Sequence, residues 1–132
     1  MEISEDERLE SIKKKEEIAE LTAEIFKIYR QPENVAELKG KIHTILSKVA
    51  VILSYSSSKN AGAITSSLTK RAVMIDLLIE REGWGWDIVT GEVNRFCAVA
   101  NGIRFDFTKS GLNIQLPSIS KVEISPFKTE FS

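Results

Sequence analysis

Six basic side chains give this chain its clearest potential for chemistry, because no acidic residue lies among them. Residues 38–75 contain no Asp or Glu, although the net charge of the 132-residue chain is −1. Their polar neighbours are mainly Ser, Thr and Asn, which donate hydrogen bonds to phosphate without repelling it. A positive segment of this kind attracts anions, and each phosphate that it neutralises releases counterions. The predicted nucleic-acid-binding residues are Lys39, Lys41, Lys48, Lys59, Lys70 and Arg71.

The same lysines also have a structural interpretation. Lysines often lie along the edge of an apolar seam in helical bundles, with the charged end reaching solvent. The first helix is rich in Glu, so its carboxylates could pair with this basic segment. We therefore keep two hypotheses. The first is an accessory or regulatory nucleic-acid-associated protein, and the second is a structural or protein-interaction module that oligomerises through a helical seam.

Catalytic motifs are weak throughout the sequence. Cys97 and His43 are the only cysteine and histidine, and no third residue is suggested to complete a nucleophilic site. A Ser-x-x-Lys pattern occurs five times in the chain, but the partner motifs of penicillin-recognising enzymes are missing. Gly40-Lys41 lacks the upstream glycine and the following Ser or Thr of a P-loop. We predict a non-enzymatic protein with no catalytic residue.

Metal and cofactor sites are not predicted either. One cysteine and one histidine are too few for a thiolate and imidazole site. Glu16, Glu20 and Glu24 form a stripe at helical spacing that could offer oxygens to a hard cation. An acidic stripe beside lysines is more often a solvated helix face, and this is the interpretation that we adopt.

Helical periodicity dominates residues 1–82, which we assign as an amphipathic helical region. The first helix is expected over residues 4–29, because Gln31-Pro32 ends it. The second helix carries a strict three-four alternation typical of a coiled-coil seam. Its members are Val35, Leu38, Ile42, Ile45, Val49 and Ile52.

The third helix is expected over residues 61–82. Met74, Leu77 and Leu78 widen its apolar surface, which predicts that its second half is buried on more than one side. Residues 56–62 read as a turn, although one long rod through these serines is the alternative. The heptad seam favours a homo-oligomer over a monomer.

Residues 83–132 follow a different pattern and are expected to form one domain with the helical region. Thr90 is predicted to cap a short helix over residues 91–100. Alternating apolar residues then predict three strands, over 103–107, 112–116 and 122–124, that form an antiparallel meander. The predicted fold class is therefore α+β: a helical hairpin or three-helix layer, a short helix and a small sheet.

Two further features of this part of the chain have competing interpretations. Trp84 and Trp86 could stack on nucleobases, or they could close the junction between two layers of a core. Two helices followed by a hairpin also have the element order of a winged-helix DNA-binding regulator. The linker between those helices is longer than in a tight helix-turn-helix.

The compartment is inferred from what the sequence lacks. Its longest uninterrupted apolar runs are far shorter than the ~20 residues that span a bilayer. Its first residues are acidic and contain no apolar core of a secretory signal. A cytoplasmic protein without membrane contact is the expectation.

Overall fold

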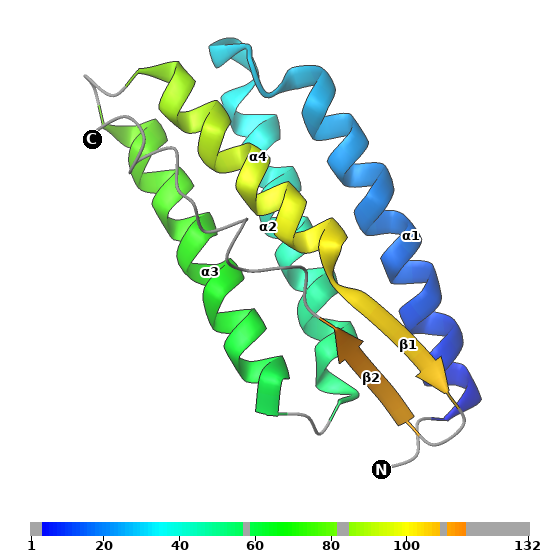
Figure 1. Cartoon of the computed structure of the whole chain (residues 1–132). Helices are drawn as coiled ribbons and strands as arrows, with labels where there is room; N and C mark the ends of the chain where they lie inside the picture. The colour runs from blue at the N-terminus through cyan, green and yellow to red at the C-terminus, as the bar shows by residue number, and fades with distance from the viewer. Residues whose placement is uncertain (1–3, 57–58, 82–84, 109–110, 116–132) are drawn as a thin grey trace.

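Four helices run alternately up and down along the chain and pack side by side (Figure 1). This computed structural model describes residues 4–56, 59–81, 85–108 and 111–115. The helices are α1 (Glu5–Ile28), α2 (Val35–Ser54), α3 (Lys59–Glu80) and α4 (Trp86–Gly102), and the strands are β1 (Arg104–Thr108) and β2 (Gly111–Gln115). Each helix packs against the next one, and α4 also packs against α1, which closes the bundle.

Local signals account for the first two helices. Ser4 and Glu7 form a capping box at the start of α1, in which each side chain accepts a hydrogen bond from the backbone of the other. The predicted stop near Pro32 is confirmed, because α1 ends at Ile28 and a short 3₁₀ turn covers Pro32–Asn34. This turn reverses the chain, so α2 runs back along α1 (Figure 1).

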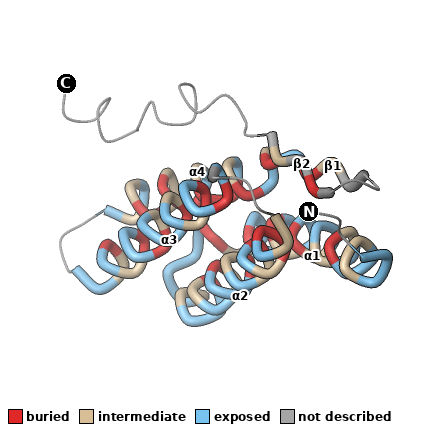
Figure 2. Tube along the Cα trace, turned by 90° about the horizontal axis from the view of Figure 1, so that it is seen from below, coloured by how far each residue is buried: buried red, intermediate tan, exposed pale blue. Residues whose placement is uncertain are grey.

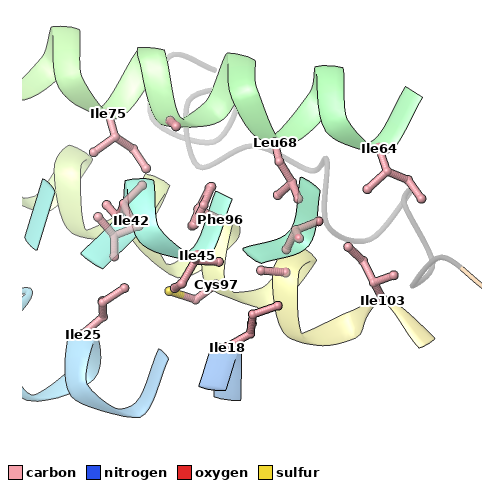
Figure 3. Packing of buried hydrophobic residues seen from close by; sticks show 14 of the residues in the cluster. Ile18, Ile25, Ile42, Ile45, Ile64, Leu68, Ile75, Phe96, Cys97 and Ile103 are labelled. Atoms are coloured by element: carbon pink, nitrogen blue, oxygen red, sulfur yellow. The ribbon is translucent and has the colours of Figure 1, made fainter. Parts of the chain in front are cut away.

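The core lies between the four helices, and the buried sides of all of them face inward (Figure 2). Ile18 and Ile25 of α1, Ile42 and Ile45 of α2 and Phe96 of α4 belong to one buried cluster, in which Phe96 lies on the α3 side, toward Leu68 (Figure 3). Five of the six seam residues of α2 are fully buried within a single chain: Leu38, Ile42, Ile45, Val49 and Ile52. The seam therefore gives no support to an oligomer, since α1 and α3 already cover it.

The predicted α+β class with a meander is wrong. The protein is predominantly helical, and in its described part the strands form only one two-stranded antiparallel hairpin, with Phe105 opposite Ile114. Phe105 and Leu112 are buried, so the hairpin caps one end of the helical core without forming a layer of its own. The third predicted strand, 122–124, lies outside the described residues.

Two predicted boundaries also need correction. The fourth helix is not short, because it begins at Trp86 and Thr90 lies inside it. The Thr90 hydroxyl donates to the carbonyl oxygen of Asp87 instead of capping the helix. Helix α2 ends at Ser54 and α3 begins at Lys59, so the alternative of one long rod is wrong.

Trp86 has a structural role at the junction between α1 and α4. Its indole Nε1 donates a 3.0 Å hydrogen bond to the carbonyl oxygen of Tyr29, and the ring packs against the core. Trp84 lies outside the described residues. Among the helices that the structure describes, none is long and apolar enough to cross a membrane.

Candidate interaction surface

A row of polar contacts joins α1 to α2 along one edge of the buried seam. Lys41 Nζ lies 3.0 Å from a carboxylate oxygen of Glu24, and Lys48 Nζ lies 2.9 Å from one of Glu17. One further heptad along, the Tyr55 hydroxyl donates to Glu10 over 2.9 Å. We call these three contacts the α1–α2 polar ladder. Its members are seven residues apart on each helix and run in opposite directions, as antiparallel packing requires.

In this ladder two of the predicted nucleic-acid-binding lysines, Lys41 and Lys48, pair with carboxylates of the same chain. The hydrogen bond from Lys48 is the main cause that lowers the pKa of Glu17, and the hydrogen bond to Glu24 is the main cause that raises the pKa of Lys41. Both shifts favour the charged pairs. The side chains of Lys41 and Lys48 are each only 20% exposed, so a phosphate would have to displace a carboxylate to reach them.

The opposite edge of the seam carries a second set of pairs, between α2 and α3. His43 Nε2 lies 2.8 Å from Asp76 Oδ2, and Lys39 Nζ lies 3.6 Å from Glu80 Oε1. Asp76 and Glu80 come directly after the acid-free segment in the sequence. Lys39 is thus also matched by a carboxylate of the same chain.

The remaining three predicted residues lie on α3 and do not extend this row. Lys59 begins the helix, and its side chain lies outside the described part. Lys70 is exposed. Arg71 is only half-buried, but its Nε is buried and makes no hydrogen bond within the described residues. The structure therefore brings Lys39, Lys41 and Lys48 to carboxylates rather than to one shared exposed face with Lys70.

The Glu17–Lys48 pair predicts a specific acid response. A lowered folded-state pKa means that the pair stabilises the fold above the unfolded pKa of Glu17 and is lost as pH falls through the folded value. Replacing Glu17 with Gln should flatten the decline in melting temperature below pH 4.5, the ordinary pKa of this carboxyl. Thermal unfolding followed by circular dichroism between acid and neutral pH measures this. Glu20→Gln on the exposed side of α1 is the matched control. An equal decline in melting temperature at acid pH for the two variants would contradict a stabilising role for the Glu17–Lys48 pair.

The groups considered for catalysis lie apart from one another. Cys97 is fully buried, and desolvation raises the pKa of its thiol to about 12, so it remains protonated and unreactive at neutral pH. His43 contacts Asp76 on the far side of α2 from the ladder. The described ranges contain no group of three His, Cys, Asp or Glu side chains able to hold a metal ion.

One groove in the structure has the volume of a small-molecule site. It measures about 390 Å³ and lies between α1 and the junction of α4 with β1. Its walls are mainly Ile18, Ala19, Ala100 and Phe105, with Asn101 beside them. The Thr22 hydroxyl, which donates to the carbonyl oxygen of Ile18, also lies 3.1 Å from the side-chain oxygen of Asn101, so this amide already has a polar neighbour. Lys15 and Glu16 complete its described lining, within which the structure shows no nucleophile paired with a base.

The exposed side of α3 is the feature that sequence reasoning missed. Val73, Met74 and Leu77 are 49%, 45% and 50% exposed, whereas Leu78 is buried. The prediction that this half of the helix is buried on more than one side is therefore wrong for Met74 and Leu77. Residues three and four apart are neighbours on a helix, so these three side chains form one continuous apolar patch. The exposed apolar residues of α1, Leu9 and Phe26, are by contrast far apart along that helix.

We define the α3 outer face as the exposed residues on this side of the helix. They are Ala63, Ser66, Lys70, Val73, Met74, Leu77 and Glu80.

Comparison with known proteins adds no relative: no protein-family model, no curated protein and no solved structure matches the chain.

Proposed function

We propose that this protein is a non-enzymatic interaction module that docks onto another protein surface through the α3 outer face. The observation that carries the proposal is the continuous patch of Val73, Met74 and Leu77, each close to half exposed. Scattered exposed apolar residues are normal on a protein surface, but a contiguous group rimmed by charged residues marks a contact site. Lys70 and Glu80 supply that rim.

The electrostatic arrangement favours this proposal over nucleic-acid binding. Lys39, Lys41 and Lys48 each lie within 4 Å of a carboxylate of the same chain. Charge pairs of this kind cancel the positive potential on which phosphate binding depends. Binding of nucleic acid remains a prediction from the sequence, with Lys70 as its most accessible described residue.

The winged-helix alternative also lacks support. In a helix-turn-helix the two helices cross steeply, at about 90–120°. Here α3 and α4 lie antiparallel, side by side, within one bundle (Figure 1). The half-buried position of Arg95, which would belong to the recognition helix, further reduces its access to a base.

Cross-linking from the patch tests the proposal. A photoreactive benzoylphenylalanine at position 74 should give discrete protein adducts in cells that express the chain. Adding Leu77→Glu should abolish these adducts, because a carboxylate at the centre of the patch must be desolvated on docking. Leu9→Glu is the matched control, since Leu9 is 54% exposed but lies on α1. Adducts that survive Leu77→Glu, or their absence from the parent protein, would contradict a docking role for this face.

A further inference from the structure

The α3 outer face has a symmetric order of side-chain types. Positions 66, 70, 73, 77 and 80 are separated by alternating steps of four and three residues, the spacing of a coiled-coil seam, and all five are exposed. Val73 and Leu77 lie at the centre. Lys70 precedes this pair by three residues, and Glu80 follows it by three. The face is therefore apolar in the middle, with Lys70 at one end and Glu80 at the other, where Glu80 also lies 3.6 Å from Lys39 and is followed by the exposed Arg81.

We propose that this face pairs with the same face of a second copy of the chain, with the two α3 helices antiparallel. The inference rests on the proposed docking function of the face and names its partner. A two-fold axis beside residue 75 places Val73 against Leu77 of the second copy. The same axis places Lys70 against Glu80 of the second copy, and symmetry forms every one of these contacts twice.

Charge complementarity selects a second copy and the antiparallel direction. A parallel pair would set Lys70 against Lys70 and Glu80 against Glu80, and like charges facing each other across an interface are unfavourable. The net charge of −1 also leaves little overall repulsion between two copies.

The same physical arrangement already exists inside the chain. Helices α1 and α2 are antiparallel, bury an apolar seam and flank it with Lys41–Glu24 and Lys48–Glu17 pairs. The α3 face is shorter in its apolar part, because only Val73, Met74 and Leu77 are large. One helix pair of this length buries less than the roughly 800 Å² per partner of a standard stable interface. We therefore expect a reversible dimer with a dissociation constant on the order of 10–100 μM.

A charge-swap series on the full chain tests the pairing. Sedimentation velocity should show a concentration-dependent dimer for the parent protein. Lys70→Glu and Glu80→Lys should each weaken it about tenfold, because both symmetry-related pairs become repulsive. In a Lys39→Gln background, where no lysine of α2 faces position 80, the double variant restores opposite charges in the pair and should recover the dissociation constant of Lys39→Gln alone to within about threefold. Leu77→Glu should remove the dimer, and Leu9→Glu should leave it unchanged.

Two controls test whether the charge swaps act through the dimer contact and not through the fold. Lys39→Gln removes the intrachain partner of Glu80 and leaves its carboxylate free for Lys70 of the second copy, so dimerisation should be at least as strong as in the parent protein. Circular dichroism melting of every variant verifies that each one is folded. A double variant that stays as weak as the single variants would overturn the antiparallel pairing. A parent protein that remains monomeric up to about 1 mM would overturn self-pairing altogether, whereas Leu77-dependent adducts from position 74 to a different protein would still support the docking function.

Discussion

Replacing Phe96 with alanine is expected to lower the free energy of unfolding by about 3–5 kcal/mol. Phe96 is fully buried on α4 and lies at the centre of the core, near Ile42, Ile45 and Leu68 (Figure 3). Removing the ring deletes its transfer free energy and leaves a cavity that helices on all sides cannot easily close. Urea unfolding followed by circular dichroism measures the change.

Phe26→Ala is the matched control for this prediction. Phe26 is also a helical phenylalanine, but it is 45% exposed, and its ring makes an edge-to-face contact with Tyr29 at 5.5 Å. Its loss should cost about 1 kcal/mol or less. Should Phe96→Ala fail to fold, Phe96→Leu supplies a milder change that is still expected to exceed the cost at Phe26. Equal costs at the two positions would contradict the packing that we describe.

Replacing Leu38 with alanine should destabilise the fold by about 2–5 kcal/mol, and the loss should not depend on protein concentration. Leu38 belongs to the α2 seam and is fully buried within one chain. A seam covered by another subunit would instead give a stability that rises with concentration through mass action. Chemical unfolding at protein concentrations spanning about two decades distinguishes the two cases.

Leu9→Ala is the control for the seam variant, because Leu9 is 54% exposed on α1. Its cost should stay within about 0.5 kcal/mol. A difference between the Leu38→Ala and Leu9→Ala midpoints that changes with protein concentration would show that the seam is intermolecular.

The helices and two of the strands followed from local periodicity and punctuation, whereas the fold class did not. The stop before Pro32 and the seam from Leu38 to Ile52 are local patterns, and the structure reproduces them. Alternation in 103–107 and 112–116 also gave two strands correctly. It could not give the fold class, because that depends on whether the strands or the helices cover the main core. Four long helices that close on one another leave only the hairpin at the end.

The partners of the lysines required knowledge of which helices are neighbours. Lys41 and Lys48 lie on one line of α2, and Glu17 and Glu24 lie on one line of α1. Sequence reasoning instead grouped Glu24 with Glu16 and Glu20, which also share a stripe on an ideal helix. Only the antiparallel register of α1 against α2 shows which stripe meets the lysines.

The exposed patch on α3 could not be located for a related reason. Leu78 and Leu77 are adjacent in sequence, yet the first is buried and the second is half exposed. A broad apolar sector predicts burial, but its width does not tell which part of it faces a neighbour. Packing of α3 against α2 on one side and α4 on the other assigns the two sectors.

The central claim is that the chain works through protein contact on α3, while its α2 lysines serve the fold. Photo-cross-linkers at position 74 and at Ser47, an exposed residue beside Lys48, compare these two surfaces in one experiment. Position 74 should give protein adducts that resist nuclease, and position 47 should give none with nucleic acid. Nuclease-sensitive adducts from position 47, together with no protein adducts from position 74, would contradict a role of α3 in protein contact.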